Sequence, residues 1–322
     1  MSPPLLELQD LSVSFRTDGG RVHAVNSVNL HVSSGETLAI VGESGSGKSV
    51  TALSILGLLG EAGRIDAGSI LFDGENLAQL REAQMRAIRG NRISMIFQEP
   101  MTSLNPVIQV GRQVAEPLVL HRGLSWKAAL VEAEGLLQQV AIPDSHGRLQ
   151  EYPHQLSGGM RQRIMIAMAL ACSPKLIIAD EPTTALDVTV QAQILALLKE
   201  LTRQTGAALI LITHDLGVVA RYADRVAVMY GGRIMETAPA VQLYGSPRHP
   251  YTRGLMNSIP ALDGDVTAEL PTIDGQPPDL GNPPPGCPFA PRCRHAREAC
   301  DAQVPQLEWL SEAHARACIG DG

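Results

Sequence analysis

The 322-residue sequence lacks any apolar run of the roughly 18 to 20 residues that a membrane-spanning helix requires. Its longest apolar runs, over residues 164–172 and 207–213, have the length of elements in a protein core. The N-terminus also lacks the basic region and following apolar stretch that mark a secretory signal. We therefore expect a cytosolic chain that meets any membrane through a partner protein.

The sequence also lacks an excess of positive charge and has few cysteines. Its formal net charge of -7 argues against nucleic acid as the main partner. Of the five cysteines, Cys172 stands alone in an apolar run and is predicted to be a buried core residue. The other four, Cys287, Cys293, Cys300 and Cys318, crowd the end of the chain. In a reducing cytosol this clustering favours a metal site over disulfides.

Two kinds of apolar pattern predict two kinds of strand. Alternating apolar residues over 5–15 and 28–32 predict half-buried antiparallel strands. Short continuous apolar runs predict fully buried parallel strands, and these runs span residues 37–41, 176–179, 209–213 and 226–229. Helical patterns lie between the runs, and one is expected over residues 48–59. The alternation predicts an α/β fold with a parallel sheet flanked by helices.

Two segments depart from this alternation. Residues 101–150 are rich in helix formers and poor in strand runs, which predicts a helical insert. Residues 271–291 are dense in proline and glycine, which predicts a loop or a semi-rigid linker. The length of the chain fits one large domain with an appendage.

A phosphate-binding loop follows the predicted strand at 37–41. Gly42-Glu43-Ser44-Gly45-Ser46-Gly47-Lys48-Ser49 fits the pattern G-x-x-x-x-G-K-[ST]. Its glycines allow successive N–H groups to turn inward and form a concave anion site at a helix N-terminus. Lys48 is expected to reach the β- and γ-phosphates, and Ser49 to bind Mg²⁺. A glycine loop that matches by chance is the alternative, but the flanking strand and helix patterns favour nucleotide binding.

A carboxylate pair ends the predicted strand at 176–179. Asp180 is expected to hold Mg²⁺, and Glu181 to orient or deprotonate the attacking water. The alternative is an acid pair that caps the next helix. Downstream of a phosphate-binding loop, however, the pair predicts NTP hydrolysis.

Further motifs point to one family. Leu156-Ser157-Gly158-Gly159-Met160-Arg161-Gln162-Arg163 resembles the signature sequence of ATP-binding-cassette (ABC) ATPases. Gln98 follows a strand pattern at 93–97 as the Q-loop glutamine does, and Thr184-Ala185-Leu186-Asp187 resembles the D-loop. His214 matches the switch histidine, and Phe15 lies where the family has an aromatic residue that stacks on adenine. The resemblance covers about residues 5–235.

The resemblance implies a P-loop ABC ATPase fold: a RecA-like parallel sheet core, an antiparallel β subdomain and a helical subdomain. It implies catalytic roles for Glu181, His214 and Gln98, and a D-loop role for Asp187. It implies a Mg²⁺ site formed by Ser49, Gln98 and Asp180. The implied ATP contacts are Phe15, Gly42, Glu43, Ser44, Gly45, Ser46, Gly47, Lys48, Ser49 and Val50. The signature residues, implied to face ATP held by a partner subunit, are Leu156, Ser157, Gly158 and Gly159.

Two segments resemble the dipeptide and oligopeptide importer branch of this family. The first is Gln98-Glu99-Pro100-Met101-Thr102-Ser103-Leu104-Asn105-Pro106. The second is Ser246-Pro247-Arg248-His249-Pro250-Tyr251-Thr252, followed by Leu255 and Ile259-Pro260. The prolines of the second segment predict a turn before a short helix. We expect a nucleotide-binding domain over residues 1–245, with its helical subdomain at about 100–165, and a C-terminal extension over residues 246–322.

The four late cysteines follow the spacing C-x5-C-x6-C-x17-C. Zinc sites usually contain C-x2-C pairs, which are missing, and four spread cysteines also suit an iron–sulfur cluster. The resemblance implies a [4Fe–4S] cluster held by Cys287, Cys293, Cys300 and Cys318. Zinc and free thiols are the alternatives. A structural role is favoured over electron transfer, because a short proline-rich tail gains stability from a metal.

The resemblance implies an ATPase subunit that energises an importer of dipeptides or oligopeptides from the cytoplasmic face of the inner membrane. Its implied partners are a second ATPase subunit, two transmembrane permeases and an extracytoplasmic solute-binding protein, without nucleic acid. A heterodimer of ATPases is expected, and an identical second subunit is the alternative. The rival functions are a soluble ABC ATPase acting on nucleic acid or the ribosome, a redox-sensing binding protein, and an importer of nickel or glutathione.

Overall fold

The computed structural model describes residues 3–99, 103–184, 186–258 and 272–320. The chain forms two compact units, each built from separate segments. The first contains the chain up to Val32, Thr37–Gln79 and the chain from Thr213 onward, and the second contains Ser33–Glu36 and Leu80–Ile212. A few residues of the motifs quoted above lie outside the described residues, namely Pro100, Met101, Thr102, Ala185, Ile259, Pro260 and Pro271.

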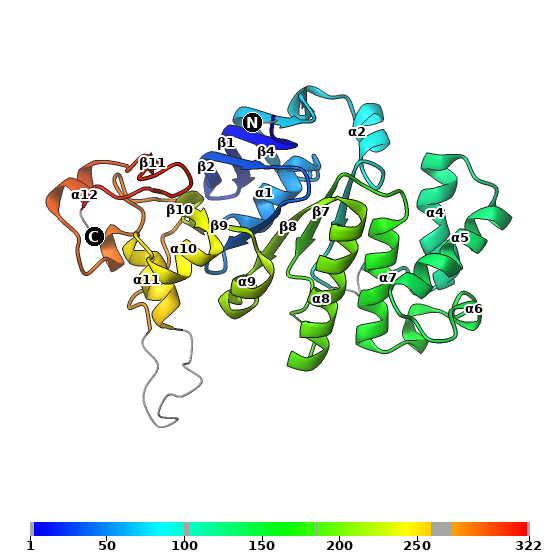
Figure 1. Cartoon of the computed structure of the whole chain (residues 1–322). Helices are drawn as coiled ribbons and strands as arrows, with labels where there is room; N and C mark the ends of the chain where they lie inside the picture. Colours follow the sequence, from blue (N-terminus) through cyan, green and yellow to red (C-terminus); the bar gives the residue numbers. More distant parts are fainter. Residues whose placement is uncertain (1–2, 100–102, 185, 259–271, 321–322) are drawn as a thin grey trace. The chain divides into compact units, whose positions relative to one another are not determined.

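The first unit contains an antiparallel sheet of four strands in the order β2-β1-β4-β5 (Figure 1). Its strands are β1 (Leu6–Thr17), β2 (Gly20–Val32), β4 (Gly63–Phe72) and β5 (Glu75–Asn76). The alternating apolar residues of β1 and β2 point their side chains into the core, which confirms the two predicted strands. The patterns did not predict β4, because Ile70 and Phe72 are its only buried residues.

The first unit also contains the strands that lead to the phosphate loop, in the order β11-β12-β10-β9-β3. They are β3 (Thr37–Val41), β9 (Arg225–Tyr230), β10 (Arg233–Pro239), β11 (Glu308–Trp309) and β12 (Ala315–Arg316). β3 pairs with β9 in parallel, whereas β10 and β12 add antiparallel strands. Every residue of β3 is buried, as the continuous apolar run predicted.

Helix α1 (Lys48–Ile55) follows β3 and ends earlier than the predicted residue 59. Gly57 adopts a left-handed φ of 63°. The Leu58 N–H turns back to the Leu53 carbonyl at 2.8 Å, so the chain forms a glycine-dependent helix stop. The other helices of this unit are α9 (Leu216–Tyr222), α10 (Ala240–Gly245), α11 (Pro250–Asn257) and α12 (Glu298–Ala302), with short 3₁₀ turns at Leu77–Gln79 and Ala290–Arg292.

The second unit holds three parallel strands in the order β8-β7-β6. They are β6 (Ile93–Ile96), β7 (Leu176–Asp180) and β8 (Ala208–Thr213), and the latter two are buried throughout. Its helices include α2 (Glu82–Ile88), α4 (Val110–Arg122), α5 (Trp126–Gln139), α6 (Ser145–Arg148), α7 (Gly158–Leu170) and α8 (Val188–Thr205), with a 3₁₀ turn at Pro153–Gln155. Helices α4 and α5 pack on each other and on α7, which confirms a helical insert (Figure 1).

The C-terminal extension shares its core with the first unit. Helix α11 begins at Pro250, as the two prolines predicted. From 272 to 289 the chain has no helix or strand, which confirms the predicted loop for these described residues. Tyr251 and Phe289 pack with Val41 and Tyr230 in one hydrophobic cluster. The extension is therefore joined to the end of β3, where the phosphate loop begins.

The prediction of a buried Cys172 was wrong. This cysteine is only partly buried, because it lies in the turn after α7, where Ser173 N–H bonds back to Leu170. Its thiol approaches the Pro117 carbonyl at 3.5 Å, and partial burial raises the pKa of Cys172. Separately, no helix within the described ranges is both long and apolar enough to cross a bilayer.

Candidate functional site

Two glycines of the loop between β3 and α1 occupy positions that no larger residue can take. Gly42 has a φ of 151°, and a Cβ there would lie 2.0 Å from the Met229 carbonyl oxygen. Gly47 has a φ of 102°, and its Cβ would lie 2.5 Å from the Ala24 carbonyl oxygen. The loop is thus pressed against β9 and β2 by backbone contacts that only glycine permits.

The charge of the loop is supplied by Lys48, the first residue of α1. Its side chain is buried, and Nζ donates hydrogen bonds to the carbonyl oxygens of Gly42 at 2.8 Å and Glu43 at 2.9 Å. Gly47 gives α1 no side-chain cap. A positive side chain therefore lies across a concave turn at a helix N-terminus, an arrangement that suits a phosphate anion.

Sequence reasoning missed two residues that hold this loop. The Glu43 N–H donates to the Tyr251 hydroxyl at 2.9 Å, and Arg292 Nη1 donates to Glu43 Oε2 at 2.8 Å. Both partners come from the C-terminal extension. Tyr251 belongs to a segment singled out from the sequence, but its contact spans 208 residues, and no local pattern reports such a contact.

Two further predicted residues of the first unit, Phe15 and His214, lie in β1 and after β8. Phe15 is partly exposed and pairs with Val22 of β2 and Gly63 of β4. A Cβ on Gly63 would lie 2.7 Å from the Phe15 ring, so the glycine makes room for it. His214 is exposed in the turn before α9. The next residue, Asp215, caps α9 by accepting hydrogen bonds from two backbone N–H groups.

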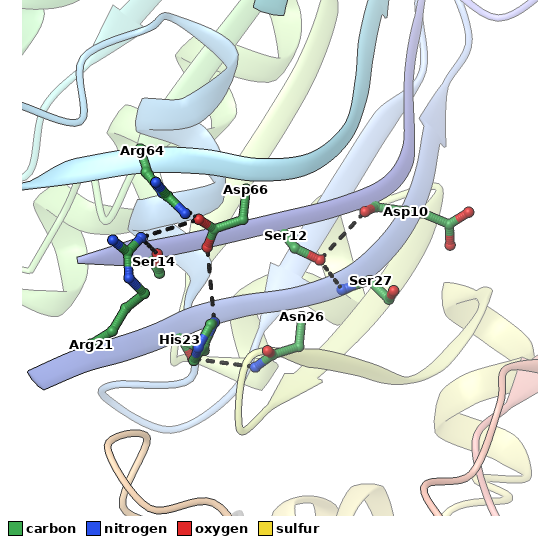
Figure 2. A network of polar contacts seen from close by, with 9 residues as sticks. All are labelled: Asp10, Ser12, Ser14, Arg21, His23, Asn26, Ser27, Arg64 and Asp66. Carbon is green, nitrogen blue, oxygen red and sulfur yellow. Dashed lines mark hydrogen bonds and ion pairs between the residues drawn. The ribbon is translucent and has the colours of Figure 1, made fainter. Parts of the chain in front are cut away.

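Polar contacts fix the strands on either side of Phe15. Figure 2 shows Asp66 of β4 pointing toward Arg21 and His23 of β2. Arg21 also donates to Ser14 of β1, and Arg64 donates to Asp66 at 2.6 Å. Slight burial opposes ionisation of Asp66, but the hydrogen bonds with Ser14 and Arg64 outweigh it and lower its pKa. The network links all three strands next to Phe15.

The second unit positions the carboxylate pair. Asp180 is the buried last residue of β7. Glu181, the next residue, has a left-handed φ of 46°, which is a strained conformation for a residue other than glycine. Gln98 Nε2 donates to Glu181 Oε2 at 3.0 Å, and Thr184 Oγ1 donates to the same oxygen at 2.9 Å. Gln98 and Glu181, predicted separately, are thus brought together. Thr184, quoted above only as part of the D-loop match, also holds the Glu181 carboxylate.

The signature segment opens helix α7. Ser157 accepts a hydrogen bond from Met160 N–H at 3.3 Å and caps the helix, while Leu156 is buried. Ser157 and Gly158 are exposed, so this helix N-terminus is accessible to an anion. Asp187 caps α8 in the same way through Val190 N–H.

The four late cysteines line one cavity of about 90 Å³, together with His249 and His295. All four are free thiols. Among the residues that the structure describes, no three His, Cys, Asp or Glu side chains are placed to hold a metal ion. The thiols are therefore gathered at one cavity without metal-binding geometry. Burial raises the pKa of Cys287 to about 11 and also raises that of Cys293.

Backbone contacts set the walls of this cysteine cavity. The Cys287 N–H donates to the Cys300 carbonyl at 2.7 Å. The preceding Gly286 lies so close that its Cβ would fall 2.1 Å from the same carbonyl oxygen. Glycine is therefore required where the two cysteine-bearing turns cross.

A phosphate loop between a buried strand and a helix, with a carboxylate pair at the end of another parallel strand, defines the class of P-loop ATPases. Residues 25–184 match the family described as ABC transporter. Residues 235–300 match the family described as oligopeptide/dipeptide transporter, C-terminal region. The chain belongs to the ABC transporter ATP-binding proteins that carry this C-terminal region.

Similar proteins cover nearly the whole chain. The dipeptide transport ATP-binding protein DppD of Bacillus subtilis is 55% identical over 98% of this chain and 94% of its own length. The oligopeptide transport ATP-binding protein OppD of Salmonella typhimurium is 54% identical over 98% of this chain and 93% of its own length. The dimeric post-hydrolysis structure of the ATP-binding cassette MJ0796, bound to ADP and Pi, has a TM-score of 0.66 and 29% identity over 73% of this chain and 98% of its own. The expected ABC ATPase fold and ATP-hydrolysing activity are confirmed.

Proposed function

We propose that this ABC ATPase hydrolyses ATP to energise the import of dipeptides or oligopeptides. The observation that carries the proposal is the loop Gly42–Ser49, closed by Lys48 at the N-terminus of α1. The peptide substrate is supported by the match of residues 235–300 and by the names of relatives with 54–55% identity. The rival substrates are nickel and glutathione.

The proposed roles follow from the chemistry of each residue. Phe15 stacks on adenine, and residues 42–50 surround the phosphates of ATP. Ser49, Gln98 and Asp180 form the Mg²⁺ site through oxygen atoms, which Mg²⁺ prefers. Glu181 orients or deprotonates the attacking water. Its carboxylate is supported in this role by the hydrogen bonds from Gln98 and Thr184, which fix Oε2. His214 contacts the γ-phosphate.

We also propose that two ATPase subunits sandwich each ATP. The exposed N-terminus of α7, with signature residues Leu156–Gly159, faces the ATP of the partner subunit, together with Asp187, which caps the contacting helix α8. A dimeric solved cassette of similar fold supports this arrangement. We infer that the second ATPase subunit is a different protein. Mass analysis of the purified complex distinguishes this heterodimer from a dimer of two identical chains.

The permeases are proposed to dock on the helical subdomain, which we place at about residues 100–165. Exposed apolar side chains gather at one cavity of about 400 Å³ there, and they include Val107, Ile108 and Trp126. Such a patch on a polar surface suits a protein partner. The chain would then act at the cytoplasmic face of the inner membrane, with a solute-binding protein supplying the peptide outside.

We propose that residues 1–245 form the nucleotide-binding domain and residues 246–322 an extension that holds a [4Fe–4S] cluster. Four cysteines that line one cavity supply the ligand type that such a cluster requires. When bound, the cluster would cross-link Cys287, Cys293, Cys300 and Cys318. Zinc in the same cavity is the alternative.

Metal analysis of anaerobically purified protein tests the cysteine site. Iron and sulfide in equal amounts would support the cluster. Zinc without iron would show that the cavity holds zinc instead of the cluster, and absence of all three would overturn the metal proposal. Cys293→Ser should destabilise the extension with a smaller effect on nucleotide binding. Normal metal content and melting temperature in this variant would count against the site.

Peptide uptake by the reconstituted importer tests the function. Glu181→Gln should abolish uptake and ATP turnover while ATP still binds, and Glu200→Gln, an exposed change of the same type on α8, should change neither. Uptake that survives Glu181→Gln would mean that hydrolysis here is not the driving reaction. Failure to co-purify with permeases, together with ATPase activity stimulated by nucleic acid, would favour the soluble rival.

A further inference from the structure

Glu43 connects the phosphate loop to the C-terminal extension. Its N–H donates to the Tyr251 hydroxyl at 2.9 Å, and its Oε2 accepts from Arg292 Nη1 at 2.8 Å. Its carbonyl oxygen accepts from Lys48 Nζ at 2.9 Å. One residue of the loop is therefore held at three points, and two of them belong to the extension.

The Arg292 guanidinium is fixed on all sides. Its side chain is only 6% exposed. Besides Glu43, it donates to the Tyr230 hydroxyl at 3.1 Å and to the carbonyl oxygens of Ile273 at 3.0 Å and Asp274 at 2.9 Å. Burial opposes its charge, but the hydrogen bonds to Glu43 and Tyr230 outweigh this and raise the pKa of Arg292. A planar group with four partners has one orientation, so it presents Nη1 to Glu43 at a fixed place.

Tyr251 is fixed by an aromatic platform. Its ring centroid lies 4.5 Å from that of Tyr230 and 5.3 Å from that of Phe289, and the latter two rings meet edge to face. Tyr230 ends β9, the strand that pairs with β3. The Tyr251 hydroxyl is thus held against the loop by rings from both β9 and the extension.

We propose that Arg292 and Tyr251 are positioning residues through which the C-terminal extension sets the conformation of the phosphate loop and hence the affinity for ATP. The inference rests on the proposed ATP site at Gly42–Ser49. Without these contacts, the Glu43 peptide samples other orientations, and only a fraction of loops is ready to bind. Loss of Arg292 also removes the positive charge that is paired with the Glu43 carboxylate. The unpaired carboxylate would then repel the negatively charged triphosphate.

The test uses the full chain in its complex, with MgATP titrated against each variant. Arg292→Gln should raise the ATP dissociation constant and KM by about five- to tenfold, as expected for a charge-assisted pair that is largely shielded from water. Tyr251→Phe, which keeps the ring but removes the acceptor, should raise them by about two- to fivefold. In both variants kcat should stay within about twofold, because neither residue is placed at the reacting atoms.

Two control variants separate this role from general stability. Arg294→Gln removes a neighbouring cation whose ion pair with Asp274 is exposed, with side chains 80% and 75% accessible, and it should leave ATP affinity unchanged. Arg292→Lys keeps the charge but not the four-partner geometry, and should restore part of the affinity.

A double variant tests whether Arg292 and Glu43 affect ATP binding through the hydrogen bond between them. Arg292→Gln combined with Glu43→Gln should weaken ATP binding no more than the stronger single change. Full multiplication of the two effects would overturn the inference, as would a lower melting temperature with unchanged ATP affinity in Arg292→Gln. If Arg292→Gln does not fold, Tyr251→Phe decides alone. A wild-type protein that fails to bind MgATP would instead overturn the proposed function.

Discussion

Replacing Glu236 with glutamine tests how the C-terminal extension is fastened to the ATPase. Glu236 of β10 is fully buried, yet its carboxylate accepts three hydrogen bonds. They come from Arg248 N–H at 2.6 Å, His249 N–H at 2.9 Å and His314 Nε2 at 2.7 Å. One side chain therefore holds both the turn before α11, which carries Tyr251, and the segment before β12.

The size of the effect follows from the number of acceptor atoms. Glutamine has the same shape but only one accepting oxygen. Either orientation of its amide places the NH₂ group against a backbone N–H, that of Arg248 or that of His249, because these donors meet different carboxylate oxygens. A buried donor without a partner costs about 1–3 kcal/mol, and the remaining bonds lose their charge assistance. We expect Glu236→Gln to lower the unfolding free energy of the extension by about 2–4 kcal/mol.

A single tryptophan can report this change. The chain has two tryptophans, Trp126 in the helical insert and Trp309 in β11, where it pairs with Ala315 next to His314. In a Trp126→Phe background, urea unfolding followed by Trp309 emission reports on the part of the extension that contains the bond from His314 to Glu236.

The control is Glu308→Gln, which makes the same chemical change at an exposed position of β11. It should alter the unfolding free energy by less than about 0.5 kcal/mol. A Glu236→Gln effect as small as that of the control would show that the Glu236 carboxylate does not hold the extension in place.

Three further substitutions test separate parts of the account. Gly42→Ala should abolish measurable MgATP binding, because the added Cβ would lie 2.0 Å from a backbone oxygen of β9. An unchanged MgATP affinity in a calorimetric titration would contradict this. His214→Ala should leave ATP binding within a few-fold and lower steady-state turnover by roughly 100-fold, so a normal turnover rate would remove this residue from catalysis. Gly286→Ala should destabilise the extension by about 1–3 kcal/mol through overpacking. The control Gly245→Ala, whose added Cβ would meet nothing within 4 Å, should not change the melting curve. Equal melting curves for the two variants would argue against the close contact between Gly286 and the Cys300 turn.

Features encoded by neighbouring residues could be predicted from the sequence. The buried strand at 37–41 and the loop after it were predictable, because a continuous apolar run and regularly spaced glycines are local signals. The end of α1 was missed by four residues, since the same apolar pattern continues past Gly57, where the backbone turns left-handed. Strand β4 was missed because few of its residues are buried.

Features that depend on distant contacts could not be predicted. The Arg292–Glu43 pair joins residues 249 positions apart, and the bond from His314 to Glu236 joins residues 78 positions apart. Each of these side chains alone is most often a solvated surface charge. The packing of the extension against the first unit brings them together as partners.

The most direct test of the account is a calorimetric titration of MgATP into the purified chain, with and without its partner subunits, for the wild type and for Lys48→Ala. We expect saturable binding at one phosphate loop per chain for the wild type and loss of that binding for Lys48→Ala. Absence of binding to the wild type, or equal affinity for both proteins, would contradict the claim that this loop holds the triphosphate.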